Sequence, residues 1–222
     1  MVQARAEATR SAVVRAGAVV FNREGFAGAR TTDITREAAV TNGAMQFHFR
    51  TKEDLALAVI AEYTRDFEPA ITSIPTHHDS GLIAAMELSA AIARQLVEEP
   101  IVGAAYRLRM EESAFRPRVT RPYVEAVGVF DELFQRAANA GDLRLGLNTN
   151  DVARYVVASF IGVQLVSDTL TSRTDLIQRA ADMWVFLLPS ITTPSRLRQQ
   201  LEAARRIFVT HYTKSRSDLA AN

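Results

Sequence analysis

The sequence contains no cysteine, and this absence excludes several kinds of site. Disulfides, thiolate-ligated zinc and thiol nucleophiles all require that residue. The sequence also lacks a phosphate-cradling glycine loop, a nucleotide-binding fingerprint, a nucleophile elbow and a His-Glu-x-x-His motif. His77, His78 and Asp79 could in principle hold a metal, but adjacent side chains project in different directions. We therefore expect no enzyme activity, no cofactor and no metal.

The sequence also has no apolar segment long enough to span a membrane. The longest apolar stretch, residues 156–166, is too short for a bilayer and is interrupted by Ser159 and Gln164. The N-terminal ten residues contain no apolar signal core. A chain of 222 residues with 48% hydrophobic content can nevertheless bury a sizeable core, as one domain or two. These features predict a cytoplasmic protein without a membrane partner.

Neither sign of charge dominates the sequence, since the net charge is +1, but the charges are unevenly distributed. Residues 1–52 carry eight Lys or Arg and four acids, which gives +4 and leaves −3 for the remainder. A basic end on a mildly acidic chain is typical of a DNA-binding head on a neutral body, although ordinary surface scatter is an alternative.

The stretch from Thr31 to Asp54 has the pattern of a helix-turn-helix followed by a long helix. Thr31 and Thr32 are candidate caps for a first short helix, and Thr41 for a second one over residues 42–49. In such a motif the second helix enters the major groove with its N-terminal residues at the base edges. An Asn can pair with adenine, a Thr can contact phosphate or a thymine methyl, and a Gly allows close approach.

The next helix begins with a capping-box pair, Thr51 and Asp54. Lys52 lies in its first turn, where exposed amides and a cation together could hold a phosphate. The helix is expected to run to about Phe67, because the residue before Pro69 is pushed away from helical geometry.

These residues resemble the DNA-binding domain of TetR-type repressors over roughly residues 5 to 60. The resemblance is carried by Gly25-Phe26, by Ala38 to Ala44, and by Phe47-His48-Phe49 before Lys52 to Leu55. Within that family, the Phe-His-Phe element and the stretches 181–184 and 187–190 resemble the γ-butyrolactone receptor group of actinomycete regulators.

The resemblance implies a set of DNA-contacting residues. Thr9 and Arg10 would touch the backbone, and His48 a backbone phosphate. The family usually has Leu-Tyr before Phe-His-Phe, whereas this chain has Met45-Gln46; Gln46 could still reach a phosphate or an adenine edge. The full expected set is Thr9, Arg10, Thr32, Thr41, Asn42, Gly43, Gln46, His48 and Lys52.

The body of the chain also has a helical pattern, without strand alternation or repeats. We expect an all-α fold, with a three-helix head at residues 1–51 and a ligand-binding and dimerisation body at 52–222. The first helix should span 3–24 and stop at Gly25, with 25–28 as a connector. Predicted body helices cover 82–97, 101–112, 123–140, 152–169, 175–189 and 194–211, with a frayed tail after Tyr212.

Two helices, at residues 150–169 and 175–188, are more apolar than one small body needs. The resemblance implies that they form a four-helix bundle with the same helices of a second subunit. The two heads could then occupy DNA half-sites that are separated by about one turn of the double helix, or by a multiple of one turn. Trp184 would then belong to the core or to this interface. The alternative is that all these apolar residues are internal core.

The body is also expected to contain a mostly apolar pocket with a few polar groups. Candidates on apolar helix faces are Tyr63, Tyr106, Tyr123, Phe130 and Gln164, each of which could instead be core or surface. The receptor group usually has a tryptophan shortly after the proline that corresponds to Pro122; Ala126 stands there in this chain.

The sequence hypothesis is a homodimeric repressor that binds a pseudo-palindromic operator and is released by a small molecule, γ-butyrolactone-like or antibiotic-related. One alternative is a pseudo-receptor that senses a pathway end product or no ligand. A pocket enzyme or carrier with a vestigial head is the other.

Overall fold

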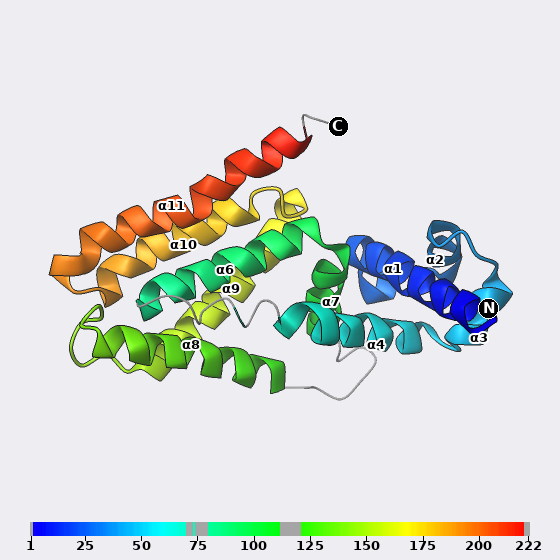
Figure 1. Ribbon diagram of the computed structural model, residues 1–222, viewed down its shortest axis with the longest axis horizontal. Helices are drawn as coiled ribbons and strands as arrows, with labels where there is room; N and C mark the ends of the chain where they lie inside the picture. The colour runs from blue at the N-terminus through cyan, green and yellow to red at the C-terminus, as the bar shows by residue number, and fades with distance from the viewer. Residues whose placement is uncertain (1, 70–72, 74–79, 112–120, 220–222) are drawn as a thin grey trace. The chain divides into compact units, whose positions relative to one another are not determined.

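The computed structural model describes residues 2–69, 73, 80–111 and 121–219, and most of these residues form helices (Figure 1). Across these ranges no β-strand occurs, and Leu143 and Thr192 form an isolated antiparallel bridge. The predicted all-α class is therefore confirmed. The elements are α1 (Val2–Gly28), α2 (Thr31–Glu37), α3 (Asn42–His48), α4 (Lys52–Glu62), the π-helical turn η1 (Tyr63–Phe67), α6 (Gly81–Glu98), α7 (Pro100–Glu111), α8 (Arg121–Asn139), α9 (Thr149–Thr171), α10 (Leu176–Ile191) and α11 (Pro194–Leu219).

The helices belong to two compact units. Unit 1 comprises Met1–Ala70 and Glu98–Val119, so it contains α1 to α4, η1 and α7. Unit 2 comprises Ile71–Val97 and Thr120–Asn222, with α6 and α8 to α11. Of the described helices, none is long and apolar enough to cross a membrane. The compact units are defined by contacts between residues and not by function. The division into a DNA-binding head, residues 1–51, and a ligand-binding body, residues 52–222, therefore remains a prediction.

In unit 1, α1 lies against α4 and α7. Phe21 on α1, Leu55 on α4 and Leu108 on α7 are fully buried at these contacts. A Cβ added to Gly17 would lie 2.9 Å from Leu55 Cδ2, so the absence of a side chain lets α1 and α4 approach closely. Ile34 of α2 is also fully buried, and the two-helix motif is thereby anchored on a rigid core.

Two predicted boundaries near the start of the motif are wrong. Gly25 breaks α-helical geometry with φ 72°, as a stop residue should, but helical hydrogen bonding resumes and carries α1 to Gly28 instead of leaving 25–28 as a connector. Thr31 and Thr32 do not cap α2, because Arg30 occupies the N-cap position in an extended conformation and the helix begins at Thr31. The two threonines are therefore in its first turn.

The continuation of α4 to Phe67 is confirmed, although its last turn widens into η1. Arg109 of α7 holds this turn. Its guanidinium lies 4.7 Å from the centroid of the Tyr63 ring, pairs with Glu68 Oε1 at 3.2 Å and donates to Thr64 Oγ1 at 2.9 Å. A π-helical turn is uncommon and is often found at functional sites.

Unit 2 is built around the buried Trp184 of α10. Its ring lies 6.3 Å from that of Phe134 on α8, and Leu188 one turn further along α10 is also fully buried. Figure 1 shows α10 and α11 side by side, in agreement with their contacts. A Cβ on Gly81 would clash with the backbone oxygen of Leu133, so only glycine allows α6 and α8 to meet there.

Three helix ends in unit 2 differ from those that the sequence predicted. Asn148, not the pair at 150–151, caps α9 by accepting hydrogen bonds from the N–H groups of residues 150 and 151. Helix α10 passes Pro189 and ends at Ile191, although Pro189 has no N–H to donate to the carbonyl group of residue 185. Helix α11 begins at Pro194 as predicted but reaches Leu219 rather than 211, so the predicted frayed tail is wrong.

Candidate functional site

A tight turn joins α2 to α3 in unit 1. Val40 N–H donates to Thr35 O at 3.1 Å, and Ala39 between the helices adopts φ 52°. This left-handed conformation is uncommon for a residue with a side chain. Thr41 then caps α3 as predicted, since its Oγ1 accepts the N–H of Ala44 at 3.2 Å. The turn and cap fix the direction in which the short α3 leaves the core.

The N-terminal end of α3 is open to solvent. Thr41, Asn42 and Gly43 are exposed, as is Gln46 one turn later. A Cβ on Gly43 would meet no atom within 4 Å. Met45 on the opposite face is buried and holds α3 to the core. The residues that the sequence assigned to base edges therefore share an accessible face, and their contact with DNA remains a prediction.

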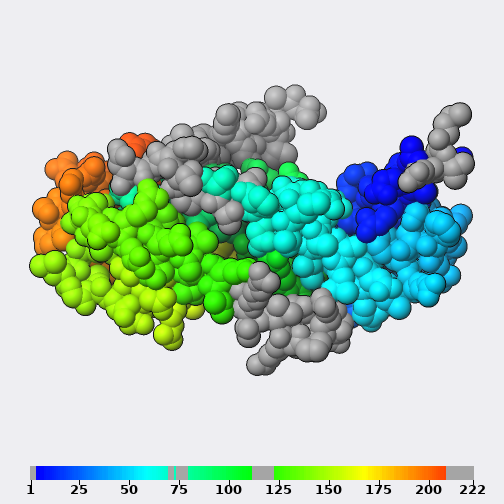
Figure 2. All heavy atoms as spheres, turned by 60° about the horizontal axis from the view of Figure 1, so that its bottom comes forward, coloured from blue at the N-terminus to red at the C-terminus, as the bar shows by residue number. Residues whose placement is uncertain are grey.

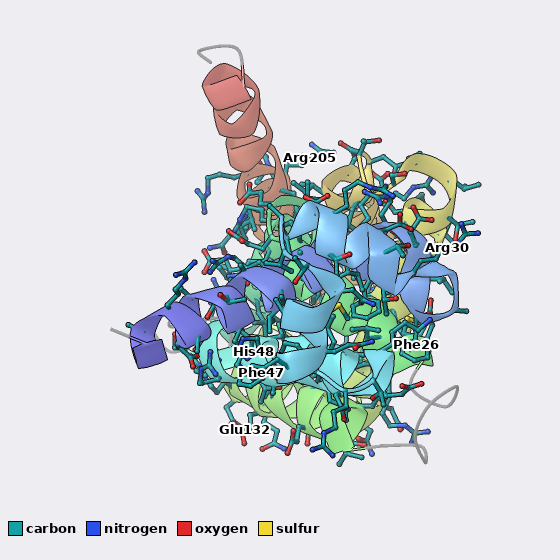
Figure 3. The ribbon with its side chains drawn as sticks, turned by 90° about the vertical axis from the view of Figure 1, so that its right-hand side faces the viewer. Phe26, Arg30, Phe47, His48, Glu132 and Arg205 are labelled. Atoms are coloured by element: carbon teal, nitrogen blue, oxygen red, sulfur yellow. The ribbon has the colours of Figure 1, made fainter. Side chains whose placement is uncertain are left out.

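The sequence prediction did not include Phe47, which is the most exposed large aromatic residue of this motif. Its side chain is 80% exposed, and its ring meets the half-buried His48 edge-on with centroids 5.1 Å apart. Figure 3 labels both residues on the side of unit 1 that faces the viewer. Helical spacing from Gly43 to Phe47 could have identified this residue as part of the exposed face.

Flanking side chains add positive charge to the same unit. Arg30, at the N-cap of α2, and Arg50, after α3, are exposed. Arg36 pairs with Asp33 at 3.1 Å. In the space-filling view the light-blue atoms of this part of the chain form a convex surface (Figure 2). A convex surface that carries exposed arginines and the open face of a short helix has the charge that fits a DNA groove.

The residues expected to touch the DNA backbone differ in their surroundings. Arg10 is half-buried, with its guanidinium carbon 5.3 Å from the centroid of the Phe49 ring. Thr9 is also half-buried and donates its hydroxyl to Arg5 O in its own helix at 2.9 Å. Thr32 is exposed on α2. Their phosphate contacts remain predictions.

Lys52 makes internal contacts that the sequence did not suggest. Its Nζ donates to Phe26 O at 2.7 Å and to Ala29 O at 3.1 Å, and it lies 4.5 Å from the centroid of the Phe26 ring. These bonds use two of the three ammonium protons. Lys52 therefore has a structural role in holding the end of α1 and the residue that follows it, and the predicted phosphate contact would be additional to this role.

The six ligand-binding candidates are divided between the two units. Tyr63 and Tyr106 pack together in unit 1, with ring centroids 5.7 Å apart at 81°. Burial, together with the adjacent Tyr106 hydroxyl, raises the pKa of Tyr63 above its ordinary value. Arg109 covers the other side of that ring. This arrangement suits a phenol that stays protonated and packed.

The other four candidates are in unit 2. Phe130 is buried and stacks on Phe134 at 6.3 Å, and Gln164 on α9 is buried as well. Ala126 is half-buried and Tyr123 is exposed, both on α8. None of these positions by itself tests ligand binding. The histidine pair at 77–78 and Asp79 lie outside the described residues.

The sequence prediction did not identify one further polar group in unit 2. The indole N–H of Trp184 is fully buried and has no hydrogen-bond acceptor among the described residues. Native proteins pair nearly all buried donors, so an unpaired one requires an explanation. A ligand oxygen or a water molecule inside the body would satisfy it.

Helices α9 and α10 expose apolar side chains on their outer faces. Phe186 of α10 is 82% exposed, and Tyr155, Leu165 and Leu170 of α9 are exposed too. An open hollow of about 510 Å³ lies between these helices, and its lining includes Tyr155, Ser159, Val163, Met183, Phe186 and Leu187. Contiguous exposed apolar surface of this kind marks an interaction face.

Two family descriptions match this chain. Residues 13–59 match "Bacterial regulatory proteins, tetR family", which spans the helix-turn-helix of unit 1. Residues 79–193 match "Tetracyclin repressor-like, C-terminal domain".

Individual relatives agree with this result. The A-factor receptor protein of Streptomyces griseus is 33% identical over 195 residues, covering 86% of this chain and 67% of the relative. The crystal structure of a gamma-butyrolactone receptor (ArpA-like protein) superposes with a TM-score of 0.75 at 27% identity, over 92% of this chain and 99% of the other. The structure of the TetR family protein CprB of Streptomyces coelicolor, in complex with its operator sequence, superposes with a TM-score of 0.77 at 28% identity. The match covers 93% of this chain and 99% of the other.

Proposed function

The chain belongs to the TetR family of bacterial regulatory proteins, and from that premise we propose that it is a homodimeric repressor that a small signalling molecule releases from a pseudo-palindromic operator. It is a DNA-binding regulator related to butyrolactone receptors and not an enzyme, like the relatives described above. A regulator of bacterial DNA acts in the cytoplasm.

The exposed N-terminal face of α3 carries the proposal of operator binding. Thr41 caps the helix, Met45 anchors it, and the face with Asn42 and Gln46 is left open to solvent. Amide side chains at such positions can read adenine in the major groove. We assign residues 1–51 to DNA binding and residues 52–222 to effector binding and dimerisation.

The apolar faces of α9 and α10 support a homodimer. A second copy of this chain would cover Phe186 and Tyr155 and fill the hollow beside them. Two symmetric heads could then occupy two half-sites of one operator, which is the usual geometry of helix-turn-helix dimers.

A ligand in the body is supported by the unpaired indole N–H of Trp184 and by the buried Gln164. We expect such a site to be mostly apolar, with a few polar groups that orient the ligand. The names of the relatives point to a γ-butyrolactone-like compound. Ala126, where that group usually has tryptophan, favours the second candidate function, a pseudo-receptor that senses a pathway end product or no ligand.

Release would operate by population shift. A ligand that prefers a conformer with wrongly spaced heads lowers operator affinity by that preference and no more. We assign α4 as the lever, because the capping box of Thr51 and Asp54 fixes its start in the head and η1 continues it beyond Glu62.

Fluorescence anisotropy of the purified protein on the DNA upstream of its own gene tests this function. We expect salt-sensitive binding that an organic extract of the host culture reverses. Binding that no extract fraction disturbs would favour the pseudo-receptor. Absence of selective binding would contradict the repressor function and would favour a carrier with a vestigial head.

A further inference from the structure

Residues 25–30, which comprise the end of α1 from its kink at Gly25 and the two residues before α2, are here named the α1–α2 corner, and charged side chains from two other helices hold it. Glu111 of α7 accepts the Phe26 N–H at its Oε2, 2.6 Å away. Lys52 of α4 donates its Nζ to Phe26 O at 2.7 Å and to Ala29 O at 3.1 Å. Both backbone polar groups of Phe26 are thus bonded to ionised side chains. Such charge-assisted hydrogen bonds are about twice as strong as neutral ones.

A second residue of α7 holds the end of α1 just before the corner. Arg107 donates from Nη1 to the carbonyl oxygens of Asn22 and Arg23, at 3.1 and 3.2 Å. Its Nε pairs with Glu111 Oε1 at 3.1 Å, so the two α7 side chains orient each other. The carboxylate therefore reaches Phe26 in a fixed position.

The backbone of the corner is shaped to admit this carboxylate. Gly25 has φ 72°, and a Cβ added there would lie 2.7 Å from Glu111 Oε1 and 3.0 Å from Arg107 Nε. Any other residue would both strain the backbone and displace the Glu111 carboxylate. The kink in α1 and the contact with α7 therefore depend on each other.

From these contacts we infer that Glu111 is a positioning residue through which α7 sets the α1–α2 corner and, through it, the DNA-reading helices. The inference rests on the proposed repressor function. In the sequence α7 lies between two segments of unit 2, yet its residues belong to unit 1. The corner leads directly into α2, which begins at Thr31. Because Phe26 is bonded to α7 on one side and to α4 on the other, a displacement of α7 relative to α4 breaks one bond or moves the corner.

The test compares Glu111→Ala and Glu111→Gln with a control on the same helix, Arg109→Gln. Arg109 contacts Thr64, Glu68 and the Tyr63 ring, away from the corner. Amide hydrogen exchange at Phe26 is measured on the free full-length protein. Affinity is measured for a duplex that the wild-type protein selects from a random library and for a scrambled duplex.

For Glu111→Ala we expect exchange at Phe26 to accelerate about tenfold or more, and affinity for the selected duplex to fall about tenfold, as loss of one charged hydrogen bond implies. Affinity for the scrambled duplex should not change, because it depends on phosphate contacts that Glu111 does not make. Glu111→Gln retains an acceptor but not the charge, so it should be intermediate. Arg109→Gln should leave exchange at Phe26 unchanged.

Unchanged exchange and unchanged affinity in both Glu111 variants would overturn the inference. An equal fall in affinity for both duplexes, together with a lower midpoint of unfolding, would also overturn the inference. Glu111 would then only stabilise the fold. If the wild-type protein selects no duplex, the repressor function fails, and exchange at Phe26 alone decides whether Glu111 holds the corner.

Discussion

At the residue scale, Ala39 is the residue of the helix-turn-helix whose backbone conformation is least favourable for a residue with a side chain. It is exposed and has φ 52°, a region where a Cβ costs about 1 to 2 kcal/mol. Glycine would remove this strain but would add about 0.4 to 1 kcal/mol of unfolded-state entropy. We therefore expect Ala39→Gly to raise the free energy of unfolding by about 0.5 to 1 kcal/mol.

Denaturant unfolding at a fixed protein concentration checks this prediction, because a dimer's stability depends on concentration. Ala38→Gly is the matched control. Ala38 is the adjacent alanine with φ −78°, where glycine only adds disorder to the unfolded chain and should destabilise. A destabilised Ala39→Gly protein would contradict the argument from backbone strain.

A second residue-scale prediction concerns Asn42. If its exposed amide reads a base, Asn42→Ala should weaken binding to the selected duplex by about 1 to 3 kcal/mol and leave the salt dependence unchanged. Arg50→Ala is the contrasting variant: loss of an exposed cation should weaken binding to every duplex and reduce the salt slope by about one. Titrations at several salt concentrations separate the two. Equal losses of Asn42→Ala on all sequences would assign that residue to the backbone.

Local signals account for the residues that the sequence predicted correctly. The caps at Thr41 and Thr51 depend on side chains within three positions, so the sequence contains all the information. The role of Lys52 depends on Phe26 and that of Arg107 on Asn22, and these partners are brought together only by packing. Phe47 was missed because an aromatic residue in a short helix is usually core.

At the scale of elements, Asp175 joins α9 to α10. Its carboxylate accepts the Ser167 hydroxyl at 2.6 Å, the Thr171 hydroxyl at 2.8 Å and Arg179 Nε at 2.7 Å. These bonds, the Ser167 bond above all, lower the pKa of Asp175 from 3.8 to about 2. Because the folded-state pKa is lowered, the stabilisation is fully present above pH 3.8 and is lost as the pH falls towards 2.

We therefore expect Asp175→Asn to unfold at a lower temperature than the wild-type protein at pH 6, and this difference to shrink between pH 4 and pH 2. Thermal unfolding followed by circular dichroism measures it. Asp151→Asn removes an exposed carboxylate from the first turn of α9 and is the control. A difference that stays constant down to pH 2 would show that the charge on Asp175 does not stabilise this junction.

Helix existence was predictable across the described chain, whereas several helix ends were not. Periodic apolar residues and the prolines at 100 and 194 specify where helices lie. The helix was predicted to end near Pro189, but α10 continues past this proline to Ile191. The turn η1 at the end of α4 lies against Arg109 of α7, a contact that no local sequence pattern contains.

At the scale of the whole molecule, the proposed homodimer predicts the behaviour of Phe186→Arg. The Phe186 side chain lines the hollow between α9 and α10 and is 82% exposed, so a second copy of this chain would bury it. A buried, unpaired guanidinium is strongly unfavourable. The variant should therefore remain helical and become monomeric at concentrations where the wild-type protein is a dimer, as sedimentation velocity would measure.

Leu145→Arg is the matched control, because Leu145 is fully exposed but lies in the segment between α8 and α9, away from the hollow. It should remain dimeric. Operator affinity should follow the assembly state: a monomer contacts one half-site at a time and loses the gain in effective concentration, about 100-fold or more, that a linked second head provides. If Phe186→Arg stays dimeric with unchanged operator affinity, the two copies meet through another surface, and the spacing of the heads is set elsewhere than at α9 and α10.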